Sequence, residues 1–433
     1  MTELRRFAAD LPLQPCDKGA PGRVEVALDQ VSEQRWSLLG EDLPMPAAVI
    51  KRAALHNNSR WMKGFLDVTG CRIAPHGKTT MSPALFALQI EDGAWGITLS
   101  TPHQLHVGRA FGFQRILLAN QLVGRSAMDW VMAEIQRDPA FEFHCLVDSL
   151  ENLEELAAAA RAWALDRPLR VLVEIGFEGG RTGCRSVEAA LTVARRAAQL
   201  SDVIALAGVE GFEGIIRGPT EPETIARVEA FLGQMVDLAQ ACAQEKLFAP
   251  GLVIFTAGGS AFFDLVSKRL GAIEIGQEHA VILRSGCYLT HDSVMYTQLF
   301  HQLKSRAPEL ADRLGELEPA LEVWAYVQSR PEPGRAIVAL GKRDISYDHL
   351  PVPVGWCRPK GKTRKVEAAP DHHKVLALND QHCIMSVPED SPWQVGDLVG
   401  FGVSHPCLTF DKWRVLHLVD DDYQVVQSIR TYF

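Results

Sequence analysis

The fold is indicated most clearly by residues 171–214, which read VLVEIGFEGGRTGCRSVEAALTVARRAAQLSDVIALAGVEGFEG. Two short apolar runs, Val171–Ile175 and Ile204–Val209, flank an amphipathic stretch rich in Ala and Leu. This order of strand, helix and strand is the unit from which parallel sheets are built. Each apolar run leads directly into a turn rich in glycine and charged residues, so the functional groups of this fold are expected at those turns.

The same alternation extends in both directions, from about residue 47 to about residue 300. Outside the central unit, the strand-like runs are Arg72–Pro75, Gly96–Ser100, Arg115–Ala119, Phe141–Val147, Leu252–Thr256 and Ile273–Leu283. With the two central runs they make eight strands, and eight βα units in roughly 230 residues match a TIM-type (β/α)8 barrel. The sequence therefore predicts an α/β protein with a barrel over residues 46–317.

A second domain is indicated after residue 318, where Val, Trp and Tyr runs alternate with turn residues and no helical pattern separates them. The runs are Leu321–Val327, Arg335–Leu340, Cys383–Val387, Asp397–Val403, Trp413–Leu418 and Tyr423–Arg430. They predict a C-terminal antiparallel β domain over residues 318–433. We expect residues 1–45 to form an extension that adds a strand from Gly22–Val31, and residues 351–365 to form an exposed loop.

Composition excludes several classes of function. A net charge of −9 argues against a nucleic-acid partner, because such binding needs a concentrated basic surface. The sequence contains no apolar run of the length that crosses a bilayer and no signal-peptide pattern, so we expect a cytoplasmic protein without a membrane partner. The nine scattered cysteines are expected to be mostly buried thiols rather than a disulfide framework.

Candidate site residues follow three of the predicted strands. Lys78, in the segment PHGKTT at residues 75–80, comes just after the first strand. If protein encloses it, this lysine would lose its proton readily and could attack an aldehyde. In the alternative, it is a solvated surface lysine. The turns TAGGS (256–260) and RSGCY (284–288) follow the last two strands, where TIM-type barrels often bind phosphate. Either turn could equally be an ordinary βα connection.

Two further features carry chemistry of their own. Glu210 ends an otherwise apolar strand, and its ordinary interpretation is a salt bridge to Arg181 or another arginine. His405 and Cys407 stand two residues apart, a combination that zinc accepts, although such a pair also arises by chance. A third metal ligand could come from His372, His373 or His382, or from water and substrate.

These segments, taken in order along the chain, resemble the D-threonine aldolase/D-serine dehydratase family. The segments that carry the resemblance are PHGKT (75–79), RTG (181–183), GGS (258–260), SGCY (285–288) and HPC (405–407), and it extends from Pro46 to Cys407. The family has the alanine-racemase-type fold of fold-type III pyridoxal-phosphate enzymes, in which a barrel precedes a β domain. Its members usually form homodimers.

The resemblance also implies roles for individual residues. Lys78 would bind pyridoxal 5'-phosphate as a Schiff base and later remove or return the α-proton of an amino-acid substrate, and Glu210 stands where members often have Tyr or Gln facing the pyridine nitrogen. His405 and Cys407 would bind a divalent metal. The remaining cofactor-binding residues implied are His76, Arg181, Gly258, Gly259, Ser260, Ser285, Gly286, Cys287 and Tyr288.

Cys407 favours the D-serine dehydratase branch with Zn²⁺, since the aldolase branch more commonly has aspartate there, suiting Mn²⁺ or Mg²⁺. We therefore expect elimination of water from a D-β-hydroxy amino acid such as D-serine, D-threonine or 3-hydroxyaspartate, giving a 2-oxo acid and ammonia. The alternative is an aldolase that releases glycine and an aldehyde. A racemase, or a cofactor-binding protein with little catalysis, fits less well because neither needs the metal pair.

Overall fold

The computed structural model describes residues 12–21, 25–360 and 364–433. The chain divides into two compact units, each built from segments that are separate in sequence. We call Gly64–Lys78 with Gly93–Gly286 the barrel unit. We call Met1–Lys63, Thr79–Asp92 and Cys287–Phe433 the β unit.

The barrel unit contains the eight predicted strands, all parallel, in the order β2-β9-β8-β7-β6-β5-β4-β3. Their bounds are β2 Arg72–Ile73, β3 Ile97–Leu99, β4 Arg115–Gln121, β5 Glu142–Val147, β6 Leu169–Ile175, β7 Ile204–Gly211, β8 Val253–Ala257 and β9 His279–Leu283. A parallel bridge between His76 and Thr98 joins the two edge strands. The predicted TIM-type fold is confirmed.

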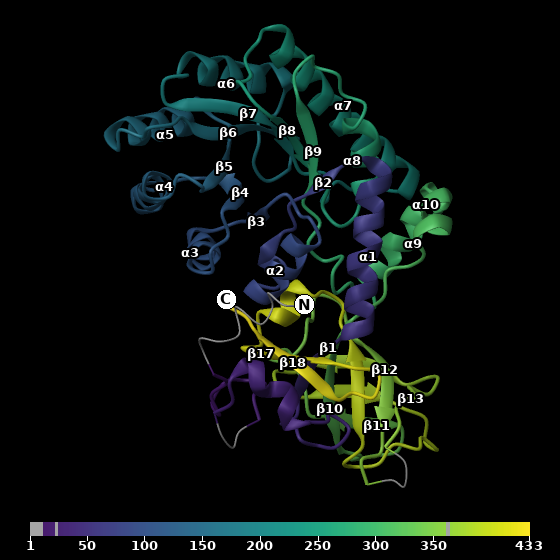
Figure 1. The fold of residues 1–433 in the computed structure, drawn as a ribbon. Coiled ribbons are helices and arrows are strands. Elements are labelled where there is room, and N and C mark those ends of the chain that lie inside the picture. The colour runs from purple at the N-terminus through teal and green to yellow at the C-terminus, as the bar shows by residue number, and fades with distance from the viewer. Residues whose placement is uncertain (1–11, 22–24, 361–363) are drawn as a thin grey trace. The chain divides into compact units, whose positions relative to one another are not determined.

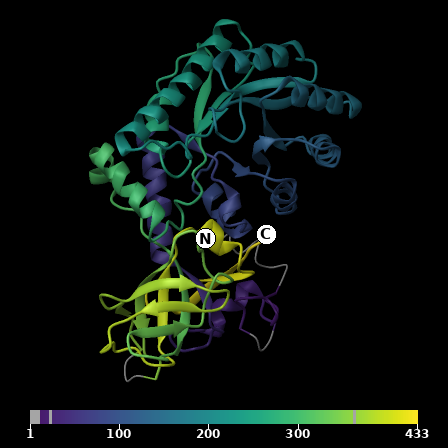
Figure 2. The ribbon, with the colours of Figure 1, turned by 180° about the vertical axis from the view of Figure 1, so that it is seen from behind.

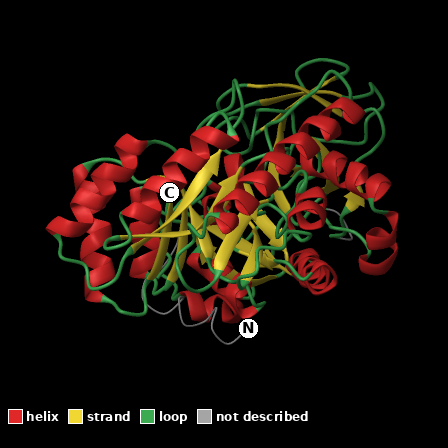
Figure 3. Ribbon diagram, turned by 90° about the horizontal axis from the view of Figure 1, so that it is seen from above, coloured by secondary structure: helices red, strands yellow, loops and turns green. Residues whose placement is uncertain are grey.

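Helices cover the outer side of this curved sheet (Figures 1 and 2). They are α3 Pro102–Ala110, α4 Arg125–Arg137, α5 Leu150–Ala162, α6 Val187–Gln199, α7 Glu221–Gln244 and α8 Phe263–Leu270. Figure 3 distinguishes the helices of the protein, in red, from its strands, in yellow. The apolar side of each helix packs against the sheet. Polar groups are therefore expected in the loops at the strand ends.

The inside of the sheet changes from apolar to polar toward the carboxyl ends of the strands. Leu172, Ile254 and Ile282 belong to the buried apolar cluster within the sheet. Because side chains two residues apart face the same side of a strand, the next inward positions are Glu174, Thr256 and Arg284. Glu210 lies level with Glu174 and Thr256 in the strand register. We call Glu174, Glu210, Thr256 and Arg284 the polar layer.

Gly208 brings Glu210 into this layer. The pairing of β6 with β7 shifts register just before the Leu172–Gly208 pair, and Gly208 has φ +155°. A Cβ atom at this position would collide with the Ile254 carbonyl of the neighbouring strand. Only glycine therefore permits this close approach of β7 to β8.

We expect Gly208→Ala to lower the free energy of unfolding by more than about 3 kcal/mol, because backbone atoms cannot yield as a flexible side chain does. Gly251→Ala is the matched control: its φ is +106°, yet no atom lies within 4 Å of the added Cβ. Urea denaturation followed by circular dichroism compares the two variants. Equal destabilisation of both would show that φ alone, and not the contact with Ile254, requires the glycine.

The β unit contains a ten-stranded sheet that is mostly antiparallel. Its strands are β1 Ala47–Lys51, β10 Leu321–Ser329, β11 Arg335–Val338, β12 Val352–Cys357, β13 Glu367–Ala368, β14 Lys374–Leu378, β15 Cys383–Ser386, β16 Leu398–Gly402, β17 Val415–Val419 and β18 Val425–Arg430. All six predicted strands are present. Strand β1 pairs antiparallel with β10 and parallel with β17, which brings a segment from before the barrel into this sheet.

Two predictions about this unit are wrong. The expected loop at residues 351–365 contains β12, which pairs with β16 despite a register shift at Pro353 and Gly355. The expected strand Gly22–Val31 does not form over its described part: Val26 makes only an isolated bridge to Leu13, and a 3-10 helix begins at Leu28. Residues 22–24 lie outside the described residues.

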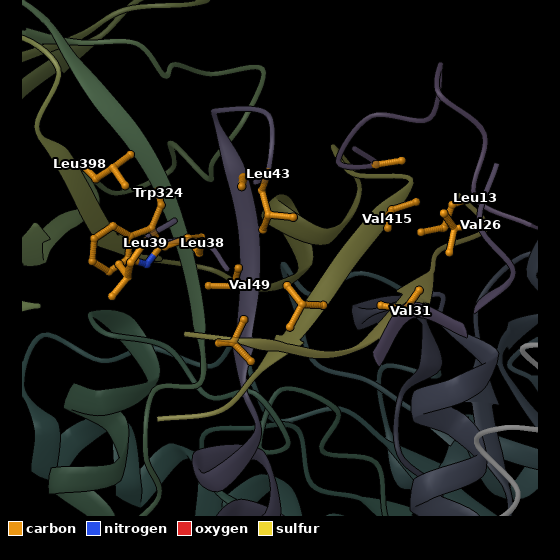
Figure 4. Packing of buried hydrophobic residues seen from close by; sticks show 14 of the residues in the cluster. Leu13, Val26, Val31, Leu38, Leu39, Leu43, Val49, Trp324, Leu398 and Val415 are labelled. Carbon is orange, nitrogen blue, oxygen red and sulfur yellow. The ribbon is translucent and has the colours of Figure 1, made fainter. Parts of the chain in front are cut away.

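The N-terminal segment contributes side chains to the core of the β unit instead of a strand. Leu13, Val26, Val31 and Leu38 are buried together with residues of the sheet, including Trp324 (Figure 4). The helices of the unit are η1 Leu28–Gln34, the first part of α1 Arg52–Thr69, α2 Pro83–Glu91, α9 Met295–Arg306, α10 Pro308–Leu314 and α11 Cys407–Phe410. Among the described residues, no helix is long and apolar enough to span a membrane.

Candidate active site

Lys78 and His76 follow the end of β2. The chain forms the His76–Thr98 bridge and then a single 3-10 turn, η2, at Gly77–Thr79. His76 Nε2 lies 3.1 Å from Ser100 Oγ. Lys78 is exposed, as in the alternative of a solvated lysine, and its role toward an aldehyde stays a prediction.

Three basic side chains act on the His76 imidazole. Its pKa is well below the usual value, first because of burial and then because of the positive charges of Lys78, Arg284 and Arg181. A neutral imidazole is the consequence, and Nδ1 of this ring is buried without a hydrogen-bond partner in the described part of the chain. A concentration of positive charge at the carboxyl ends of barrel strands suits an anionic ligand.

Glu210 forms a buried ion pair with Arg284 of the polar layer. The two side chains are 2% and 4% exposed, respectively. Burial raises the pKa of Glu210 to about 8, and the Arg284 guanidinium acts in the opposite direction. The ordinary interpretation of Glu210 as the partner of an arginine is therefore confirmed, with Arg284 and not Arg181 as that partner.

One oxygen of the Glu210 carboxylate is not used in the ion pair with Arg284. Its Oε2 atom is buried and has no hydrogen-bond partner among the described residues. Arg284 also donates from Nη2 to the Gly211 carbonyl at 2.9 Å, which holds the guanidinium in place. Since buried polar atoms are normally satisfied, Oε2 is a candidate hydrogen-bond acceptor for a ligand.

Glu174 is a second carboxylate of the polar layer, and the sequence analysis missed it. It accepts hydrogen bonds from Gln121 Nε2 at 2.5 Å and from Thr182 Oγ1 at 2.7 Å. Gln121 and Thr182 also line a cavity of about 500 Å³, together with Ser100, Thr101, Pro102, Leu118, Asn120, Leu122, Val123 and Asp148. The signal was available, because Glu174, like Glu210, is a carboxylate within an apolar strand.

The loop after β6 holds Arg181 beside an aromatic ring. The Arg181 guanidinium lies 4.3 Å from the centre of the Phe212 ring, a cation–π contact. Arg185 fixes this loop by donating to four backbone carbonyls of residues 180–183. The structure thus gives Arg181 a defined place next to β7, and its role beside a cofactor stays a prediction.

The glycine turn after β8 is held by another buried glutamate. The amides of Gly258 and Gly259 donate to the Glu213 carboxylate at 3.1 and 3.0 Å, and Ser285 Oγ donates to both of their carbonyls. The family resemblance implies that Gly259, Ser260, Gly286 and Cys287 hold the cofactor phosphate, so one of these amides, that of Gly259, is already paired with Glu213. With Glu213 in this position, phosphate binding would depend on the other three residues.

His405 and Cys407 lie at the start of α11 in the β unit. His405 Nδ1 is 2.7 Å from Asp348 Oδ2, the arrangement that leaves Nε2 of a histidine to bind a metal. His373 is not available as a further ligand, since its two ring nitrogens lie within 3.1 Å of the Asp371 carbonyl and Ser391 Oγ.

The predicted cofactor residue Tyr288 accepts a hydrogen bond from Gln89.

Cys407 is also in contact with a second cysteine of the β unit. Its sulfur lies 3.6 Å from the sulfur of Cys287, and this contact lowers the pKa of the Cys287 thiol. Seven of the nine cysteines are buried, as expected. Over residues 12–21, 25–360 and 364–433, no group of three or more His, Cys, Asp or Glu side chains is arranged to hold a metal ion. A metal here would need ligands from water or substrate besides the protein.

Comparison with known proteins identifies the family. Residues 50–263 match the family model "Alanine racemase, N-terminal domain", and residues 320–419 match the model "Putative serine dehydratase domain". The 3-hydroxy-D-aspartate aldolase of Paracoccus denitrificans (strain Pd 1222) is 25% identical over 379 residues, which cover 86% of this chain and 88% of that protein. This chain belongs to the D-threonine aldolase/D-serine dehydratase family. Members of the family are pyridoxal-phosphate lyases, both aldolases and dehydratases.

Other members of the D-threonine aldolase/D-serine dehydratase family match over different lengths. The D-threonine aldolase of Arthrobacter sp is 25% identical, with 89% of this chain and 90% of that protein covered. The D-threo-3-hydroxyaspartate dehydratase of Delftia sp. (strain HT23) is 28% identical over 53% of this chain and 64% of that protein. The crystal structure of D-threonine aldolase from Filomicrobium marinum shares the fold, with a TM-score of 0.73 and 20% identity over 95% of this chain and 98% of that one.

Proposed function

We propose that this protein is a pyridoxal-phosphate- and zinc-dependent dehydratase that eliminates water from a D-β-hydroxy amino acid and releases a 2-oxo acid and ammonia. The choice of dehydration over aldol cleavage rests on one observation, the thiol of Cys407 beside an imidazole held by a carboxylate. A ligand set that includes sulfur suits zinc better than manganese or magnesium.

The residues of the barrel unit fit the cofactor. Pyridoxal phosphate supplies an electron sink that stabilises negative charge at the substrate's Cα. Glu210 Oε2, which lacks a described partner, would accept a hydrogen bond from the pyridine N–H, and the ion pair with Arg284 would hold the carboxylate in place. Lys78 Nζ would bind the aldehyde and would also take the α-proton of the substrate.

The residues of the β unit fit a metal. Asp348 would keep the proton of His405 on Nδ1 and so present Nε2, while Cys407 would bind through its sulfur. A zinc ion at this pair would act as a Lewis acid for the departing β-hydroxyl group. A cysteine-to-alanine mutant of a D-threo-3-hydroxyaspartate dehydratase is known in a metal-free form.

The second candidate function is retro-aldol cleavage to glycine and an aldehyde. Relatives that match over most of this chain, the 3-hydroxy-D-aspartate aldolase and the D-threonine aldolase, favour it. In that reaction a base would remove the proton of the β-hydroxyl group and the Cα–Cβ bond would break. The two reactions share the residues described above and differ in their products.

The two functions are distinguished by incubating the purified protein with D-serine, D-threonine and the isomers of 3-hydroxyaspartate. We expect 2-oxo acid and ammonia as the main products, and we expect a chelator to lower the rate at least about 10-fold until zinc is restored. Cys407→Ala should not regain activity with zinc, whereas Cys383→Ala, at a buried cysteine in β15, should respond as the wild type does. Glycine and aldehyde as the main products would establish the aldolase instead.

A further inference from the structure

Cys287 lies where three segments of the β unit meet. Its sulfur is 3.6 Å from that of Cys407, although the two residues are 120 positions apart in the chain. Thr79 Oγ1 is 3.7 Å from Cys287 Sγ and 3.5 Å from Cys407 Sγ. Cys287 is only 4% exposed, so this contact is part of the packed structure.

The separation of the two sulfurs is close to that of two thiolates on one metal ion. With zinc–sulfur bonds of about 2.3 Å in tetrahedral geometry, two sulfur ligands stand about 3.8 Å apart. Sulfurs in a disulfide are about 2.05 Å apart, much closer than these. The sulfurs of Cys287 and Cys407 would need to move only a few tenths of an ångström to share an ion.

We propose that Cys287 is a second sulfur ligand of the metal bound by Cys407. This inference rests on the metal in the proposed function and deepens it, because two thiolates select zinc over manganese and magnesium more strongly than one does. In tetrahedral geometry two coordination positions remain, one for His405 and one for water or a substrate oxygen. The described residues do not form a ready-made site of three ligands, so the His405 side chain has to approach the two sulfurs as the ion binds. The backbone amide of Cys287 stays available for the phosphate role predicted from the family resemblance.

The proposal can be tested by titrating metal-free protein with Co²⁺. The sulfur-to-cobalt charge-transfer absorption, measured per bound cobalt, reports the number of thiolate ligands. We expect Cys287→Ser to lower it by about half, Cys407→Ser to do the same, and the double variant to abolish it. Zinc affinity of Cys287→Ser should fall at least about 10-fold. Cys383→Ser is the matched control and should match the wild type.

The outcomes separate this inference from the proposed function. Full absorption in Cys287→Ser, together with loss in Cys407→Ser, would overturn the role of Cys287 and leave the metal at Cys407 intact. An absence of absorption in the wild type would overturn both. X-ray absorption of the zinc-loaded wild type counts the sulfur atoms bound to the zinc ion and needs no variant. A folding defect in Cys287→Ser therefore cannot obscure this result. One bound sulfur instead of two would contradict the proposal.

Discussion

Lys78→Arg is expected to lack the covalent link to the cofactor and to lose at least about 1,000-fold in turnover. Arginine keeps a positive charge near His76, so the electrostatic surroundings of that imidazole are preserved. Its guanidinium stays protonated in proteins and does not serve as an amine nucleophile. The loss would therefore report the chemistry of the Lys78 amine and not its charge.

The measurement is reduction with borohydride after saturation with pyridoxal phosphate, followed by peptide mapping. Wild-type protein should carry the label on the peptide that contains Lys78. Lys268→Arg, at an exposed lysine of α8, serves as the control and should be labelled at residue 78 like the wild type. Labelling of other lysines alone, with none at residue 78, would remove the proposed lyase chemistry altogether.

Glu210→Gln is expected to lower turnover about 100-fold or more while the cofactor still binds. Burial raises the pKa of Glu210, but a pyridinium N–H at Oε2 would favour the carboxylate form, and the carboxylate would in turn keep the pyridine nitrogen protonated. A neutral amide of the same shape lacks this negative charge. The substitution also removes the charge partner of Arg284, which is buried in the same layer. Cofactor binding should persist because Lys78 and the glycine turns are unchanged.

Turnover and cofactor absorbance are measured on the same samples, so that loss of chemistry is separated from loss of cofactor. Glu142→Gln is the matched control, since Glu142 pairs with Arg115 near the opposite ends of the strands and is partly exposed. We expect the control to retain wild-type turnover. If Glu210→Gln turned over as fast as the wild type, Glu210 would have only the structural role of pairing with Arg284.

These two predictions concern different levels of the barrel unit. Lys78 is an exposed side chain on a turn whose other two residues, Gly77 and Thr79, are buried. Glu210 is within the sheet, where a charge is costly unless it is paired, and Arg284 provides that pairing. The first prediction therefore tests an exposed amine, and the second tests a buried, paired carboxylate.

The sequence by itself determined the eight barrel strands, the position of Lys78 after the first of them and the spacing of His405 and Cys407. Each of these depends on local information: the period of apolar residues, the turn residues that interrupt it, and side chains a few positions apart. The expected strand at Gly22–Val31 failed because that segment packs side chains into the β-unit core without joining its sheet.

Only the tertiary structure decided which distant residues meet. It paired Glu210 with Arg284, directed two glycine amides to Glu213 and brought Cys287 to Cys407. It also recruited β1 from before the barrel into the β-unit sheet. These contacts depend on strand register and on the packing of segments far apart in sequence, and local periodicity carries no information about either.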